Sequence, residues 1–248
     1  MADHIKIVET TIRALKILSE TNEGMGVREL SRMLEVNKST CHRMLLTLED
    51  NGIVNYDNSN QKYQPSLGML QIANKTAEHN NLINTALPHM TRLRDLTNET
   101  IALYVRILDY RIVVAKVESN LDLRWSPVIG NAYPLHRGAA SKVFLTCESD
   151  ELFQQVLENF SEDKDKDKFV QEIREAKLNQ YATSVNEIEL GGTGIAAPIY
   201  DKEDNLAAVV SIYGLSSRID NKMLGSFIEE IKQTAMNITK GLTLTLKH

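Results

Sequence analysis

Cysteine is scarce in this sequence, and long apolar runs are absent from it. The 248 residues include two cysteines, Cys41 and Cys147, which lie far apart and outside any CxxC pattern. This spacing argues against a disulfide framework and against a structural zinc site. No apolar run approaches the roughly 20 residues that a membrane helix needs, and the opening MADHIKIVET is too polar for a signal peptide. We therefore expect a cytoplasmic protein with no membrane partner, no metal and no cofactor.

The motifs of the common nucleotide-binding and hydrolytic enzymes are missing as well. The glycine-rich segment GGTGIAAP, residues 191–198, lacks the GxxxxGK[ST] pattern of a phosphate loop and the strand–GxGxxG–helix setting of a dinucleotide site. No GxSxG nucleophile motif occurs. We expect no enzymatic activity.

The sequence also lacks an excess of positive charge. The chain has 28 Lys and Arg against 33 Asp and Glu, a net charge of −5. This balance excludes a protein coated in basic surface but leaves nucleic-acid binding open, because a local basic footprint is enough for it. About two-fifths of the residues are apolar, so a globular core is expected, in one large domain or two ordinary ones.

Residues 1–66 predict three helices followed by a β-hairpin. Residues 8–20 place Val8, Ile12, Leu15 and Leu18 on one helical face, and residues 27–34 (VRELSRML) form a second, shorter helix. A third helix begins after the N-cap residue Asn37 and ends at Asn51-Gly52. The runs 53–56 and 62–66, rich in β-formers, flank a polar turn and predict the hairpin. This order is that of a winged helix-turn-helix.

The third helix has one face that carries no acidic residue in its first turns. Cys41, Leu45 and Leu48 share the apolar side, and hydroxyl and basic side chains share the other. Such a face is suited to the major groove, where arginine can pair bidentately with guanine, and the helix N-terminus offers free amides to a phosphate. Basic residues of the second helix and the wing are candidates for backbone contacts. The candidate DNA-binding residues are Arg28, Lys38, Ser39, Thr40, His42, Arg43, Thr47 and Lys62.

An ordinary small helical domain with a polar solvent face remains the alternative interpretation of these residues. A second functional hypothesis also stays open: a small-molecule-binding or metabolic protein whose N-terminal domain is a protein-interaction module. Charge reversal at Arg43 distinguishes the two, because only a DNA-reading helix should be sensitive to it.

The remainder of the chain predicts an α+β fold. Residues 67–80 have helical spacing and form a connecting helix, and residues 81–248 form the second domain. Strands are expected at 101–108, 112–119, 123–128, 195–201 and 206–214, and helices at 83–97, 139–147, 150–160, 168–180 and 221–240. Antiparallel strand pairs interrupted by helices favour a sandwich with an antiparallel sheet and flanking helices.

Three separated segments resemble the IclR family of bacterial transcription regulators. In residues 27–54, the family pattern stands as Lys38-Ser39-Thr40, Arg43-Met44-Leu45 and Gly52 before the wing. Residues 130–145 (GNAYPLHRGAASKVFL) and 186–214 (NEIELGGTGIAAPIYDKEDNLAAVVSIYG) match the family's later segments in the same order. The chain departs from the pattern at Ser141, where a Gly is usual, at Gly194, where Cys or Ser is frequent, and at Asn205, where a Gly is usual.

The resemblance implies a GAF-like effector-binding domain that takes a small organic acid and a homodimer or homotetramer that binds double-stranded operator DNA. In this chain the small residues of the loop that leads into the helix at 139–147 would let a carboxylate approach the backbone. Each candidate also has an ordinary structural interpretation, in helix packing, in a surface loop or in the core. The candidate effector-binding residues are Tyr133, Gly138, Ala139, Ala140, Glu187, Ala197, Ser211 and Tyr213.

Overall fold

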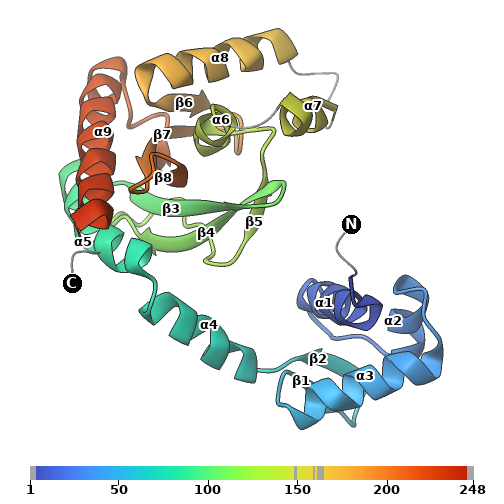
Figure 1. The fold of residues 1–248 in the computed structure, drawn as a ribbon. Helices are drawn as coiled ribbons and strands as arrows, with labels where there is room; N and C mark the ends of the chain where they lie inside the picture. Colours follow the sequence, from blue (N-terminus) through green and yellow to red (C-terminus); the bar gives the residue numbers. More distant parts are fainter. Residues whose placement is uncertain (1–3, 148–149, 159, 161–164, 245–248) are drawn as a thin grey trace. The chain divides into compact units, whose positions relative to one another are not determined.

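A computed structural model describes residues 4–147, 150–158, 160 and 165–244 of the chain (Figure 1). The chain forms two compact units, Met1–Glu78 and His79–His248. Within the described residues, no helix is long and apolar enough to cross a membrane.

The first unit has the predicted order of helices and hairpin. It contains α1 (Lys6–Ser19), α2 (Val27–Met33), α3 (Lys38–Asp50), the antiparallel strands β1 (Val54–Asp57) and β2 (Lys62–Pro65), and α4 (Gly68–Glu78). Its core joins all three first helices to the hairpin, and the loop before α2 adds a bridge between Met25 and Tyr63. The fully buried core side chains include Leu18, Leu30, Cys41, Leu45 and Val54. The winged helix-turn-helix prediction is confirmed.

The prediction of the apolar face of α1 is only partly right. Leu18 is buried and Leu15 is half-buried, but Val8 and Ile12 are 49% and 50% exposed. The helix turns Thr10, Ala14 and Leu18 inward instead. This choice of face leaves an apolar stripe on the surface of α1.

The second unit is built on a six-stranded antiparallel sheet within the described residues. The strands are β3 (Thr100–Ile107), β4 (Tyr110–Val117), β5 (Ala132–Pro134), β6 (Ala182–Val185), β7 (Gly192–Tyr200) and β8 (Leu206–Leu215), in the order β5-β4-β3-β8-β7-β6. Figure 1 shows α5 (Asn81–Thr97) and α9 (Asn221–Leu244) on one side of the sheet. The helices α6 (Ala139–Leu145), α7 (Asp150–Glu158) and α8 (Lys166–Asn179) lie on the other side. The α+β prediction with flanking helices is confirmed.

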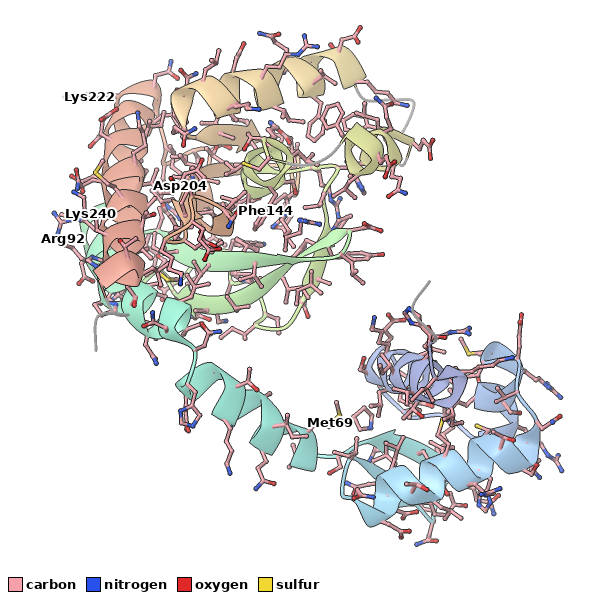
Figure 2. The ribbon with its side chains drawn as sticks, in the orientation of Figure 1. Met69, Arg92, Phe144, Asp204, Lys222 and Lys240 are labelled. Atoms are coloured by element: carbon pink, nitrogen blue, oxygen red, sulfur yellow. The ribbon has the colours of Figure 1, made fainter. Side chains whose placement is uncertain are left out.

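Each face of the sheet has its own apolar core. Residues such as Met90, Leu103 and Ile231 fill the core under α5 and α9. The core under α6, α7 and α8 contains Tyr104 of β3 and Phe144 of α6, and Figure 2 labels Phe144. Alternation along a strand sends neighbouring residues to opposite cores.

The strand predicted at residues 123–128 is wrong, and the structure has β5 at Ala132–Pro134 instead. Residues 123–128 form no strand pairing, and hydrogen bonds that involve side chains hold the segment instead. The Trp125 carbonyl accepts a hydrogen bond from Thr100 Oγ1 at 2.7 Å, and Ser126 Oγ lies 2.8 Å from Lys116 Nζ. The short strand β6 was not anticipated.

A β-bulge in β4 changes which residues face each core. Leu103 pairs with Ala115 and the next residue, Tyr104, pairs with Val113, so Val114 is the extra residue. A bulge of this kind re-aims the side chains beyond it. Ala115 therefore packs under α5 and α9, whereas Val113 joins the core under α6.

Candidate functional site

The predicted DNA-reading face of α3 is exposed. Lys38, Ser39, His42, Arg43 and Thr47 are all on the surface, and Thr40 is half-buried. Cys41, Met44 and Leu45 are buried on the opposite side and fix the rotation of the helix. Asn37 occupies the N-cap position but its side chain makes no capping hydrogen bond. The amides at the start of α3 therefore point outward without a side-chain acceptor.

A groove of about 1010 Å³ runs beside this face of α3. Its walls come from α3, from the start of α2 and from the hairpin. Three candidate residues, Lys38, Ser39 and His42, line it together with Arg28. Tyr56 and Gln61 of the hairpin also line the groove, and the sequence analysis did not single them out. Arg43, Thr40 and Thr47 lie along a neighbouring hollow between α1 and α3.

Lys62 in the wing is already engaged. Its ammonium Nζ lies 3.2 Å from Glu23 Oε2. A phosphate contact by Lys62 would have to compete with this exposed ion pair, which is a weak interaction in water.

In the second unit, the loop before α6 makes a close turn. Gly138 adopts φ +89°, and an added Cβ would stand 2.8 Å from Ile188 Cδ1 and 3.2 Å from Arg111 Nη2. The Gly138 amide donates to Glu187 Oε2 at 2.9 Å. Glu187 therefore holds the loop, and its other oxygen binds Lys142.

Lys142 is a fully buried cation with a complete set of partners. Its ammonium Nζ lies 2.6 Å from Glu172 Oε2 and donates to the Thr183 carbonyl at 2.9 Å, in addition to its Glu187 contact. Two carboxylates and a carbonyl neutralise and solvate the charge, as burial of a lysine requires. The role of this lysine is to tie α6 to α8 and to the loop after β6.

Arg111 is a buried cation of a different kind. It is 1% exposed, and its guanidinium carbon lies 4.8 Å from the ring centre of Tyr104 and 4.9 Å from that of Tyr133. Its Nε donates to Ser141 Oγ at 2.9 Å. No carboxylate of the described residues forms a salt bridge with it. Burial lowers the pKa of Arg111 and the contact with Tyr104 opposes the shift, and an arginine stays charged in either case.

Tyr213 places a buried hydroxyl on the same face of the sheet. The side chain is 5% exposed and its ring lies 4.4 Å from that of Trp125. Its hydroxyl is buried and makes no hydrogen bond to any described residue, although the Glu189 backbone lies nearby. Burial raises the pKa of Tyr213 to about 12, so the phenol is neutral at physiological pH.

The structure brings most of the candidate effector residues together on the face under α6. Ser211 pairs across strands with Ala196, and Tyr213 pairs with Gly194. An added Cβ at Gly194 would stand 2.8 Å from Ser184 Oγ and 3.7 Å from Ala139 Cβ, which places Gly194 beside the start of α6. Ser211 contacts the buried Tyr104.

Ala197 lies on the opposite face and is corrected here. It packs in the core under α5 and α9, as Ile195 does, because strand alternation directs it away from Ser211. Ala196 takes its place in the core under α6. Arg111 is the main residue of this site that sequence reasoning missed, since it lies beside the turn between two predicted strands.

Comparison with known proteins identifies the family. The family model described as bacterial transcriptional regulator IclR C-terminal matches residues 74–240, and the IclR helix-turn-helix domain matches residues 8–58. An uncharacterized HTH-type transcriptional regulator of Haemophilus influenzae is 30% identical over 242 residues, which cover 93% of this chain and 90% of the relative. The HTH-type transcriptional regulator KipR of Bacillus subtilis is 28% identical over 246 residues, covering 96% and 98%.

Solved structures show the same fold. An IclR transcriptional regulator from Alicyclobacillus acidocaldarius matches with a TM-score of 0.82 at 22% identity, covering 96% of this chain and 99% of the other. An ICLR transcriptional regulator from Silicibacter matches with a TM-score of 0.84 at 16% identity, covering 96% of both chains. With both domains matched in order, the chain belongs to the IclR family of DNA-binding transcriptional regulators.

Proposed function

We propose that the exposed face of α3 reads duplex operator DNA and that a small organic acid, bound on the face of the sheet under α6, modulates this binding. The observation that carries the DNA half is the exposure of Ser39, His42 and Arg43 on a helix whose other side is anchored in the core. Guanidinium and imidazole groups on a helix that fits the major groove are suited to read base edges. Arg28 lines the adjoining groove and supports a phosphate contact.

The effector half rests on the buried polar groups beneath α6. Arg111, Ser141, Ser211 and Tyr213 face a core that is otherwise apolar and aromatic. Mostly apolar walls with few polar anchors are the usual construction of a small-molecule site. Tyr133, Gly138, Ala139, Ala140 and Glu187 remain part of the proposed site, and Glu187 acts in it by holding the loop.

A ligand modulates DNA affinity only if it binds one conformational state better than the other. The protein is proposed to act in the cytoplasm as a homodimer or homotetramer. Support for self-association comes from the apolar side chains that the first unit leaves exposed on α1 and α4, including Ile7, Val8, Ile12, Leu70 and Ile72.

The DNA half is tested with Arg43→Glu. A duplex recovered by the wild-type protein from a random-sequence library serves as the probe. Arg43→Glu should weaken binding to it by at least about 100-fold, because it removes a base contact and adds repulsion by phosphate. Arg174→Glu on α8 makes the same charge change at another exposed arginine and should bind as wild type does.

The thermal stability of both variants should match that of the wild-type protein, since both side chains are exposed. Equal DNA affinity of Arg43→Glu and wild type would reject the proposed reading helix. It would favour an N-terminal module that binds protein instead.

A further inference from the structure

The guanidinium of Arg111 is a buried charge in the second unit for which the described residues provide no counter-charge. A buried charge normally has a counter-charge, because the desolvation of an isolated ion costs several kcal/mol. Lys142, on the same face of the sheet, follows this rule with Glu172 and Glu187. Arg111 contacts two aromatic rings and hydrogen-bonds to the side chains of Ser141 and Tyr104, and it pairs with no acid in the described part of the chain.

The local structure holds this charge in place. The bulge at Val114 directs the start of β4 toward the core under α6. Ser141 Oγ accepts from Arg111 Nε and itself lies 3.3 Å from the Pro134 carbonyl. Gly138 leaves room for Nη2, which would stand 3.2 Å from a Cβ at that position. Nε is thereby satisfied, and Tyr104 also hydrogen-bonds to the guanidinium. The two terminal nitrogens carry four N–H donors in all, so one such bond leaves donors for a ligand.

The orphan hydroxyl of Tyr213 is an independent observation that points to the same conclusion. The ring of Tyr213 contacts that of Trp125, which in turn lies 6.5 Å from the ring of Tyr133 beneath Arg111. The hydroxyl is buried without a hydrogen bond among the described residues. A buried polar group without a partner is costly, and such groups mark strain or an absent ligand.

We propose that Arg111 pairs with a carboxylate of the effector, that Ser141 fixes the guanidinium for this contact, and that the Tyr213 hydroxyl binds a second oxygen of the same molecule. The inference rests on the proposed effector site and names its ligand class: a small carboxylic acid that carries a hydroxyl or keto oxygen. The rings of Tyr104, Tyr133 and Trp125 form a continuous series of aromatic contacts between Arg111 and Tyr213.

The proposal explains one departure of this chain from its family pattern. Ser141 stands where a glycine is usual, and its hydroxyl is the group that orients Arg111. A glycine there has no side chain to accept from Nε. Arg111 and Ser141 therefore act as a pair, and we expect them to set which acid this protein recognises.

The test compares acids with their uncharged amides. The melting temperature Tm of the full chain is measured with lactate, propionate, succinate and 4-hydroxybenzoate, each against its primary amide, at constant ionic strength. At about ten times its Kd, a bound acid should raise the Tm by about 3–5 °C. Its amide should raise it by less than about 1 °C.

Four variants assign the effect to residues. Arg111→Met and Arg111→Lys should lose the difference between acid and amide, the second because an ammonium lacks the bidentate fork. Arg124→Met, at an arginine already paired with Glu118, should keep it. Tyr213→Phe should weaken binding of the hydroxy acid lactate by about 5- to 10-fold relative to propionate, the loss of one hydrogen bond.

The proposal is overturned if acids and amides raise the Tm of the wild-type protein equally, or if neither raises it. It is also overturned if Arg111→Met keeps the response to the acid. Failure of this proposal can be told apart from failure of the proposed effector site. If an uncharged molecule binds this site and changes DNA affinity, the effector site stands and the carboxylate anchor is wrong.

Discussion

At the scale of single residues, the structure separates two buried cations that the sequence shows as ordinary basic residues. Lys142 is enclosed by acids and ties α6 to its surroundings. Arg111 is enclosed by aromatic rings and a serine, without an acid among the described residues. The charge in the first arrangement is neutralised within the protein, whereas we propose that a ligand completes the second.

The sequence could not reveal Arg111, because its burial depends on long-range packing. The residue lies in the connection expected between two strands, residues 109–111, where an exposed arginine is the ordinary expectation. The bulge at Val114 and the hydrogen bond to Ser141 show that it faces α6. Ala197 was misplaced for a related reason. Both faces of β7 are buried, so its sequence has no polar side that would tell which residues face α6 and which face α5 and α9.

The backbone conformation and close surroundings of Gly138 make a substitution there testable. Gly138→Ala should lower the free energy of unfolding by about 2–3 kcal/mol, because it combines an unfavourable positive φ with a clash against Ile188. Gly130→Ala is the matched control: its φ is +90° and nothing lies within 4 Å of the added Cβ. Urea denaturation should show a smaller loss, about 1 kcal/mol, for the control. Equal losses in the two variants would mean that the crowding at Gly138 is unimportant.

At the scale of elements, periodicity predicted the helices and hairpins well. The third helix was correctly placed after Asn37, and its apolar side is the side that the core covers. The strand predicted at 123–128 failed because its alternating side chains dock by individual contacts, with Trp125 against Tyr213. A short edge strand such as β6 has too few residues for a clear pattern.

The stability of the segment 123–128 depends on pH through Glu118, which binds Arg124 and Ser126. Hydrogen bonds from Lys116 and then Ser126 lower the pKa of Glu118 to about 2 from 4.5. Because the folded-state pKa is depressed, the stabilisation is present above pH 4.5 and disappears as the pH falls toward 2. The Tm difference between wild type and Glu118→Gln should therefore shrink across this window.

Melting curves at half-unit pH steps measure that difference. Asp122→Asn, at an exposed position in the same loop, should show no such convergence. A constant gap between wild type and Glu118→Gln from pH 4.5 to 2 would contradict the assignment.

At the scale of the whole molecule, the exposed apolar side chains of α1 and α4 predict self-association. No residue of α4 is buried, and Leu70 and Ile72 are 53% and 62% exposed. Ile72→Glu should raise the dissociation constant of the oligomer by at least about 10-fold, because a charge at an apolar contact must be desolvated. Thr76→Glu, on the same helix, adds the same charge at a polar site and is the control.

Analytical ultracentrifugation over a concentration series measures this change. Identical sedimentation of wild type and Ile72→Glu at all concentrations would show that α4 takes no part in assembly. The resemblance in sequence predicted a dimer or tetramer, but an apolar stripe on one chain does not fix the number of copies.

The most direct test of the account measures DNA affinity and effector binding together. Affinity for the selected duplex is determined while the stabilising carboxylate is increased to saturation, in the wild type and in Arg111→Met. Wild-type affinity should change by a factor of about 5–150, the usual range of coupling between two sites, and Arg111→Met should bind the duplex without responding to the acid. An unchanged wild-type affinity at a ligand concentration that saturates the rise in Tm would contradict the account.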